Sequence, residues 1–303
     1  MITKKIVEKA FRKHLGIDVK SCTKQKEGHI NTIFEINKTH MLRIFSEDWK
    51  AKKEKYIYSL ISKKTDIPIP DIFAVDTTKK IIPAAFSIMS KIDGISIDNA
   101  YRKYRNKKIF EKAGEILAKM HSIKFPKFGW VVSSEIDPKF KKWEDFFWYD
   151  VKSKLAALRK LKEIKVIESG ILDCFNHYSP YLRITSKPCL LHKDFHCPHI
   201  LVNKDKIKGI IDVEWAMAGH NEEDFTKVQL WIFNKIKNIK KAFLKGYNRF
   251  ESLSNDFNER YILYELWHRL SMVNISYIVK DKNWLNYNLK ALRTCANEYH
   301  KNI

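Results

Sequence analysis

Residues 192–212 read HKDFHCPHILVNKDKIKGIID and say more about the fold than any other part of the chain. Two apolar runs, 200–202 and 207–211, flank the short polar segment 203–206. Two apolar runs around a polar turn are typical of a β-hairpin. Because the strands of a hairpin are antiparallel, the residues just outside the two runs are expected to meet in space.

Three side chains that bear chemistry lie at those outer ends. Asp194 and His199 precede the first run, and Asp212 follows the second. Two carboxylates beside an imidazole that can bind a metal suit Mg²⁺-assisted phosphoryl transfer. The hairpin therefore predicts a phosphoryl-transfer site.

Length and composition indicate a folded globular protein. The chain has 303 residues, 45% hydrophobic and 13% aromatic, enough for a buried core arranged as two lobes.

No apolar run approaches the roughly 18 residues that span a bilayer, and residues 1–13 lack the apolar stretch of a signal peptide. The five cysteines are scattered and odd in number, so a disulfide framework is not expected. These features predict a cytoplasmic protein without a membrane partner.

The net charge of +22 raises the question of a nucleic-acid partner. The positive residues are spread along the whole chain and form no single block. A lysine-rich composition explains this distribution better than a nucleic-acid interface, so nucleic acid is not the expected partner. The charge would also attract a nucleoside triphosphate.

The remaining patterns divide the chain into a mixed part and a helical part. The mixed part is predicted to contain a helix over 1–20, a strand pair at 30–45, a helix over 47–63 and strands near 72–75 and 85–92. Further helices are predicted at 109–121, 143–161, 166–178, 222–236, 239–250, 257–279 and 283–300. The predicted fold class is α+β, with an N-terminal lobe at 1–95 and a C-terminal lobe at 96–303.

Several segments resemble the aminoglycoside phosphotransferase family. The specific ones are LHKDFHCPHILV at 191–202 and GIIDVEWA at 209–216; AGEILAKMHSI at 113–123 and GHNEEDF at 219–225 support them. The resemblance covers roughly residues 20–240. It implies a protein-kinase-like bilobal fold, and the family contains aminoglycoside kinases, macrolide kinases and metabolite kinases.

The resemblance also implies roles for the residues of the hairpin. Asp194 matches the catalytic aspartate that orients the acceptor hydroxyl, and Asp212 matches the aspartate that holds Mg²⁺. His199 stands where most members have asparagine, so it could bind the metal directly, act through water, or favour Mn²⁺. Lys193 replaces a common glycine.

Nucleotide-binding residues follow from the same resemblance. Arg43 matches the phosphate-binding lysine, and Glu54 is its expected ion-pair partner on the next helix. The segment around Gly28 takes the place of the nucleotide loop, and Ser90 and Lys91 fall in the hinge that meets the purine of ATP or GTP.

Other readings of the histidines and cysteine in this segment are less favoured. His192 is expected to support the loop by hydrogen bonds, and Asp224 to stabilise the loop or cap a helix. A zinc site made of His196, Cys197 and His199 is disfavoured because the spacing is too tight and no second pair of ligands is evident. Cys197 lacks the partners of a nucleophile.

The expected function is a small-molecule kinase acting on the hydroxyl of an antibiotic, an aminoglycoside first and a macrolide next. A kinase for choline, homoserine or a sugar is the alternative within the same fold. A nucleotide- or nucleic-acid-binding protein without transfer activity is the alternative of another class. Because aminoglycosides are polycations, the first option requires an acidic acceptor pocket, for which the candidates are Glu214, Glu222, Glu223, Glu251, Asp256 and Glu259.

Overall fold

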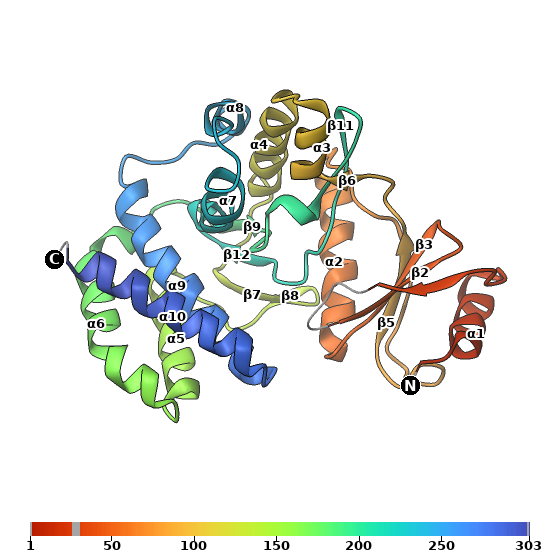
Figure 1. Cartoon of the computed structure of the whole chain (residues 1–303), viewed down its shortest axis with the longest axis horizontal. Coiled ribbons are helices and arrows are strands. Elements are labelled where there is room, and N and C mark those ends of the chain that lie inside the picture. The colour runs from red at the N-terminus through yellow and green to blue at the C-terminus, as the bar shows by residue number, and fades with distance from the viewer. Residues whose placement is uncertain (1, 26–30, 302) are drawn as a thin grey trace.

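The computed structural model describes residues 2–25, 31–301 and 303. An antiparallel sheet lies at one end of the long axis, and helices fill the other end (Figure 1). The predicted hairpin lies between the two parts (Figure 1).

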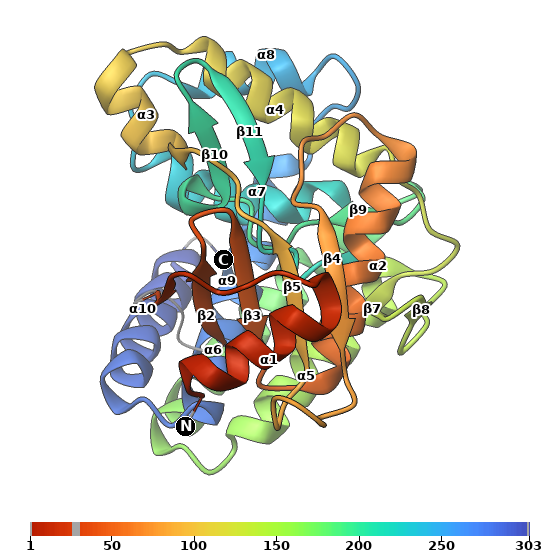
Figure 2. The same ribbon diagram turned by 90° about the vertical axis from the view of Figure 1, so that its right-hand side faces the viewer.

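The N-terminal sheet has five strands in the order β1-β2-β3-β5-β4, and all neighbours are antiparallel. Figure 2 shows α1 lying across the strands. Leu42 and Ile44 pack into the same apolar cluster as the buried face of α1. Since side chains alternate along a strand, Arg43 points to the opposite face, where α2 lies. The elements are α1 (Lys4–Leu15), β1 (Cys22–Lys24), β2 (Thr32–Ile36), β3 (His40–Ile44), α2 (Asp48–Lys64), β4 (Ile72–Asp76) and β5 (Phe86–Ser90).

The hairpin joins a three-stranded sheet with the order β11-β10-β6. Its strands are β10 (Ile200–Asn203) and β11 (Lys206–Ile210), as the sequence predicts, and β6 (Ile95–Ser96) pairs with β10. The predicted lobe boundary between residues 95 and 96 therefore falls inside a strand that contacts the hairpin. That boundary stays a prediction.

The C-terminal part is mainly helical, as expected. Its longer helices are α3 (Ile97–Tyr104), α4 (Lys108–His121), α5 (Trp143–Leu158), α6 (Lys162–Tyr178), α8 (Lys240–Tyr247), α9 (Phe257–Ile278) and α10 (Lys282–His300). The helix expected at 222–236 is divided into a 3-10 turn (Asn221–Asp224), α7 (Phe225–Val228) and a π-helical turn (Gln229–Phe233). Two further 3-10 turns are Ser179–Leu182 and Cys197–His199.

A four-stranded sheet inside the helical part was not predicted. Its order is β8-β7-β12-β9, and its strands are β7 (Gly129–Val132), β8 (Glu135–Ile136), β9 (Cys189–Leu191) and β12 (Met217–Gly219). Strands of two to four residues are too short to show a period-2 pattern. β9 leads directly into the segment that begins at His192, so this sheet fixes where that segment starts.

Two glycines allow α4 and α8 to approach each other closely. A Cβ at Gly114 would lie 2.0 Å from the Phe243 carbonyl oxygen, and one at Gly246 would lie 1.8 Å from that of Glu111. Both distances are far below van der Waals contact, so only glycine fits at this crossing. The crossing anchors α4, whose last residue, His121, reaches the hairpin region.

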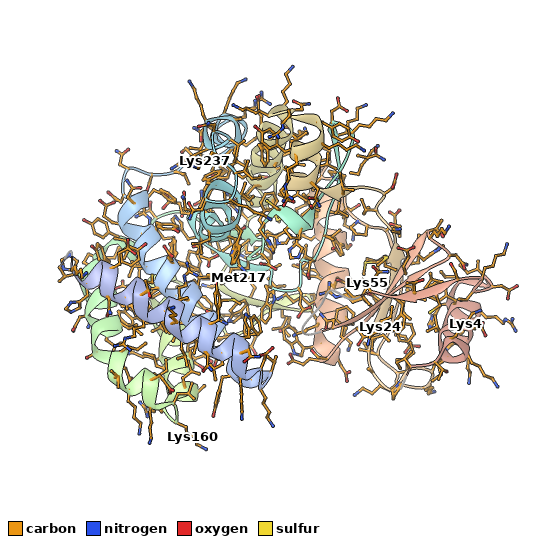
Figure 3. All side chains as sticks on the ribbon, in the orientation of Figure 1. Lys4, Lys24, Lys55, Lys160, Met217 and Lys237 are labelled. Atoms are coloured by element: carbon orange, nitrogen blue, oxygen red, sulfur yellow. The ribbon has the colours of Figure 1, made fainter. Side chains whose placement is uncertain are left out.

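The positive charge is distributed over the whole molecule. The exposed lysines labelled in Figure 3 come from elements that lie far apart in the chain: Lys4, Lys24, Lys55, Lys160 and Lys237. Among the described helices, none combines the length and apolar character needed to cross a membrane.

Candidate active site

The hairpin brings the three chemistry-bearing side chains together. Ile200 pairs with Ile210, and the Ile211 amide donates to the His199 carbonyl at 3.0 Å. As a result, His199 Nε2 lies 3.5 Å from Asp212 Oδ2, and His199 Nδ1 lies 3.4 Å from Asp194 Oδ2. The predicted meeting of the hairpin ends is present in the structure.

Asp224 holds the loop that precedes the hairpin. Its carboxylate accepts hydrogen bonds from the amides of His192 and Lys193, at 2.8 and 2.6 Å, and from Nε2 of His121 at 3.1 Å. His192 in turn donates from Nε2 to the Ile211 carbonyl at 3.1 Å and accepts from the Asp194 amide at 3.2 Å. Both residues thus make the supporting contacts that the sequence predicts for them.

We expect Asp224→Ala to destabilise the fold by about 3–5 kcal/mol, because it leaves His121 and two amides buried without an acceptor. Thermal unfolding of this variant and of Asp205→Ala, a change in the exposed hairpin turn, measures the difference. Equal melting temperatures for the two variants would contradict the support that we assign to Asp224.

Two residues of the site have left-handed backbone conformations. Both Lys193 and Asp212 have φ = 65°. For residues other than glycine this conformation costs roughly 1–2 kcal/mol, and such residues concentrate at functional sites. The glycine usual at the position of Lys193 is explained by this φ.

The His199 imidazole is oriented as a metal ligand. Its Nδ1 lies 2.9 Å from the Asp194 carbonyl oxygen. Because a carbonyl only accepts, Nδ1 carries the proton and Nε2 presents its lone pair to Asp212. The 3.5 Å between Nε2 and Asp212 Oδ2 allows both atoms to bind one divalent cation at about 2.1 Å each. These donors fit Mg²⁺, and the nitrogen also suits Mn²⁺.

In the structure, Cys197 is not available as a ligand for the alternative zinc site. Cys197 is buried, its Sγ lies 3.3 Å from the Trp231 carbonyl oxygen, and burial raises the pKa of its thiol to about 12. A thiol that stays protonated is neither a metal ligand nor a nucleophile. The imidazoles of His196 and His199 do lie with Asp194 in a group whose potential ligand atoms are all within 4.8 Å.

A lysine that sequence reasoning missed contacts the candidate catalytic carboxylate. Lys227, in α7, places Nζ 2.8 Å from Asp194 Oδ1, and His196 Nε2 lies 3.4 Å from the same atom. Burial alone would raise the pKa of Asp194, but Lys227 and His196 outweigh it and hold the pKa well below its usual range. Asp194 is therefore ionised at neutral pH. No pattern in the sequence pointed to a contact between residues 33 positions apart.

Arg43 connects the N-terminal sheet to the hairpin. It is 7% exposed and donates to Glu54 Oε1 at 2.8 Å, to Asp212 Oδ1 at 2.8 Å and to Glu214 Oε2 at 2.5 Å. Ser87 donates to the other oxygen of Glu54 at 2.9 Å. The expected pair of Arg43 and Glu54 is present. Burial would raise the pKa of Asp212, but the charge and hydrogen bond of Arg43 hold it below its usual value.

Glu214 and Lys50 extend this network and were not predicted as part of it. Lys50 Nζ lies 2.8 Å from Glu214 Oε1, and both side chains are 3% exposed. Asn31 also donates to Glu214. Four carboxylates, those of Glu47, Glu54, Asp212 and Glu214, thus share two buried cations, Arg43 and Lys50. The carboxylates outnumber the cations at the place where the donor set fits a divalent cation.

Comparison with known proteins agrees with this geometry. A family model described as the phosphotransferase enzyme family matches residues 22–260, which include every residue of the network. The chain belongs to this family. A search of curated proteins found no match.

Crystal structures of this family share the fold. The structure of aminoglycoside phosphotransferase APH(4)-Ia superposes with a TM-score of 0.78 at 15% identity, covering 97% of this chain and 99% of that one. The GDP and kanamycin complex of APH(2")-IIia gives a TM-score of 0.71 at 14% identity, covering 95% and 97%. This chain therefore has the protein-kinase-like α+β fold of the phosphotransferase family.

The other residues predicted to bind nucleotide are Gly28, Ser90 and Lys91. Gly28 lies outside the described residues. The amide of Ser90 donates to the Asp71 carbonyl at 2.9 Å, and that of Lys91 donates to the Thr39 carbonyl at 2.8 Å. Both amides already have protein partners, so neither is available to donate to a purine. The role of Ser90 and Lys91 in a hinge that binds the purine stays a prediction.

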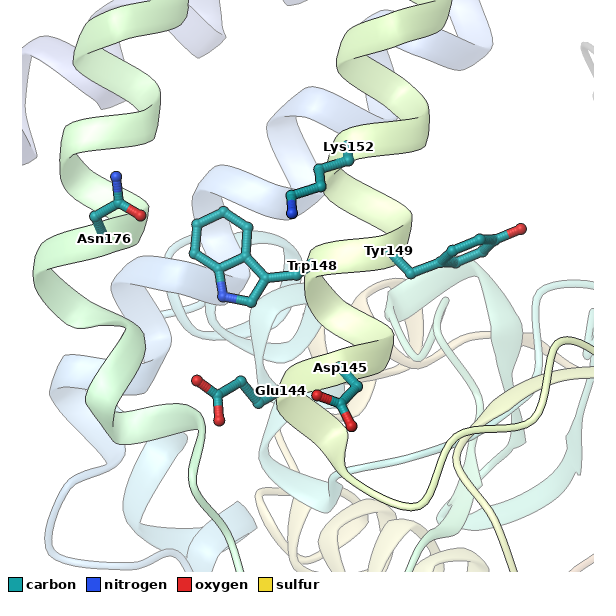
Figure 4. Close-up of a pocket in the computed structure, with 6 residues that line it drawn as sticks. All are labelled: Glu144, Asp145, Trp148, Tyr149, Lys152 and Asn176. Carbon is teal, nitrogen blue, oxygen red and sulfur yellow. The ribbon is translucent and has the colours of Figure 1, made fainter.

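A hollow of about 610 Å³ lies elsewhere, between α5 and α6 (Figure 4). It is lined by Glu144, Asp145, Trp148, Tyr149, Lys152 and Asn176. None of the residues of the network lines it, so this hollow is not part of the candidate active site.

Proposed function

We propose that this member of the phosphotransferase family is a small-molecule kinase that moves the γ-phosphate of ATP or GTP to a hydroxyl group. The observation that carries the proposal is the hairpin, which places an ionised Asp194 beside the donor pair of His199 and Asp212. Arg43 links that pair to the N-terminal sheet.

In the proposed reaction Asp194 orients the acceptor hydroxyl and receives its proton. The hydroxyl oxygen forms a bond to the γ-phosphorus, the bond from that phosphorus to the β-γ bridging oxygen breaks, and the nucleoside diphosphate leaves. Arg43 provides charge-assisted hydrogen bonds to phosphate oxygens. Asp212 and His199 would hold Mg²⁺, which would neutralise the negative charge of the phosphates.

Antibiotics are the first acceptors to test. One relative is described with AMP-PNP and hygromycin B, and another with GDP and kanamycin, so both nucleotide types and aminoglycosides occur among proteins of this fold. Macrolides, choline, homoserine and sugars complete the panel. An antibiotic acceptor would make the chain a resistance enzyme.

The test is incubation of the purified protein with Mg-ATP or Mg-GTP and each acceptor, with the product followed by mass spectrometry. We expect one acceptor class to gain a phosphoryl group in a reaction that needs Asp194. No transfer to any acceptor, together with tight and salt-dependent RNA binding, would instead favour the nucleic-acid-binding alternative.

A further inference from the structure

The carboxylates expected to form an acidic acceptor pocket are already used by the protein itself. Five of the six candidates lie within 4.0 Å of a lysine or arginine of the chain. The pairs are Glu214 with Arg43 and Lys50, Glu222 and Asp256 with Arg260, Glu223 with Lys193, and Glu251 with Lys124. Only Glu259 has no such partner among the described residues. A polycationic acceptor would have to displace these internal cations.

Beside the catalytic carboxylate lies a row of alternating lysines and tryptophans. We call Lys53, Trp130, Lys154, Trp267 and Lys193 the lysine–tryptophan row. Lys53 Nζ lies 5.8 Å and Lys154 Nζ lies 5.9 Å from the Trp130 ring centroid. Lys154 Nζ lies 5.9 Å and Lys193 Nζ lies 4.1 Å from that of Trp267. The row ends at Lys193, the residue that precedes the candidate catalytic Asp194 in the chain.

The row carries one positive charge more than its carboxylates neutralise. Asp150 pairs with Lys154 and accepts from the indole nitrogens of Trp130 and Trp267, at 3.3 and 2.6 Å. Glu223 pairs with Lys193.

Lys53 is the cation without a carboxylate. It is 1% exposed, and no carboxylate of the described residues lies within 4.0 Å of its Nζ. Burial lowers its pKa to about 7. Its nearest ring contacts are Trp49 and Trp130, and the more distant charges of Glu214 and Lys50 act on it in opposite directions. A buried ammonium without an ion-pair partner can receive an anion, because an anion would stabilise its charged form.

We propose that the acceptor is a hydroxylated molecule bearing a carboxylate or phosphate group, and that the lysine–tryptophan row receives this group. The inference rests on the proposed kinase function and names its acceptor class. Trp130, the partly exposed tryptophan of the row, would pack against the carbon frame of the acceptor, and the acceptor hydroxyl would lie toward Asp194. Lys227, paired with Asp194, neutralises a further negative charge that could attract an aminoglycoside.

Calorimetric titration tests the proposal without knowledge of the natural acceptor. The nucleotide site is first filled with Mg-ADP or Mg-GDP, so that anions cannot bind there, at about 150 mM salt to screen surface charge. The anionic probes are 6-phosphogluconate, 3-phosphoglycerate and shikimate, and the cationic probes are kanamycin and hygromycin B. We expect at least one anion to bind about tenfold more tightly than either cation, the effect of one charge-assisted hydrogen bond.

The deciding variant is Lys53→Met, with Lys152→Met as its control. Both changes remove one positive charge, but Lys152 is an exposed residue of α5 at the outer hollow (Figure 4). We expect Lys53→Met to weaken binding of the anion about tenfold and Lys152→Met to leave it unchanged. Tighter binding of a cationic probe, or equal effects of the two variants, would overturn the proposal.

Stability measurements test whether Lys53→Met remains folded. The pKa of Lys53 lies near 7 in the folded chain and about 10.4 when unfolded, so stability of the wild type should rise as pH increases between these values. We expect Lys53→Met to be at least as stable as the wild type at pH 7 and to lose this increase of stability with pH.

Phosphorylation of kanamycin would support the kinase function but overturn the proposal of an anionic acceptor. If nucleotide binding and transfer are both absent, the kinase function itself is wrong.

Discussion

Replacement of Asp194 by asparagine is expected to lower phosphate transfer about 10²- to 10⁴-fold, the usual contribution of a general base. Asparagine has the same shape but cannot receive the proton of the acceptor hydroxyl. In the proposed reaction the nucleotide is held by Arg43 and by the cation on Asp212, so its dissociation constant should change little. Steady-state turnover and nucleotide titration measure the two quantities.

Asp205→Asn is the matched control for this prediction, since Asp205 is an exposed aspartate in the turn of the same hairpin. It should behave as the wild type. If Asp194→Asn transfers phosphate at the wild-type rate, Asp194 is not the catalytic residue, and the assignment of the whole site fails.

Asp212→Asn is the second change with a large expected effect. It removes the anionic donor of the candidate metal pair and an ion-pair partner of Arg43, 2.8 Å away. The stabilisation supplied by a catalytic cation is several kcal/mol, which corresponds to a loss of about 10²- to 10³-fold in turnover. The affinity for the nucleotide should also lose its dependence on Mg²⁺, as titrations with and without the metal would show.

His199→Asn provides the comparison for Asp212→Asn. It introduces the residue usual in the family and replaces a nitrogen donor with an oxygen donor. We expect it to remain active and to shift the preference between Mn²⁺ and Mg²⁺ toward Mg²⁺, because oxygen donors suit the harder cation. An unchanged ratio of Mn²⁺- to Mg²⁺-supported rates would show that His199 does not bind the metal.

The features predicted correctly from sequence depend on local patterns. The hairpin of β10 and β11 follows from two apolar runs around a polar turn, and its antiparallel geometry alone brings Asp212 to His199. Arg43 was identifiable because a charge inside an apolar strand needs a buried partner, and Glu54 provides it.

Contacts between distant parts of the chain were beyond the reach of sequence patterns. Glu223 was proposed as one of the carboxylates of an acidic acceptor pocket, but nothing local showed that Lys193 pairs with it. Lys227 and Lys53 look like surface lysines in the sequence, and only the packing of α7 and α2 buries them. For this reason the sequence alone does not show which of the carboxylates expected to form an acidic acceptor pocket are paired with a lysine or arginine of the protein.

The small sheet of β7, β8, β9 and β12 escaped prediction on similar grounds. Its strands are held by pairing with distant residues, as when Met217 pairs with both Trp130 and Leu191. The left-handed conformation of Lys193 was also not predicted. The glycine that the family usually has at this position could have indicated it, because glycine adopts a positive φ most easily.

Phosphorus NMR of the complete reaction tests the central claim most directly. The wild-type protein is mixed with Mg-ATP or Mg-GTP and with each acceptor of the panel, which now includes the hydroxylated anions. Spectra are recorded until the γ-phosphate signal falls. The account predicts a new phosphomonoester signal that grows as the γ-phosphate signal decreases, and that is absent with Asp194→Asn and with Asp212→Asn. A phosphomonoester formed equally well by either variant, or no phosphomonoester with any acceptor in the wild type, would contradict it.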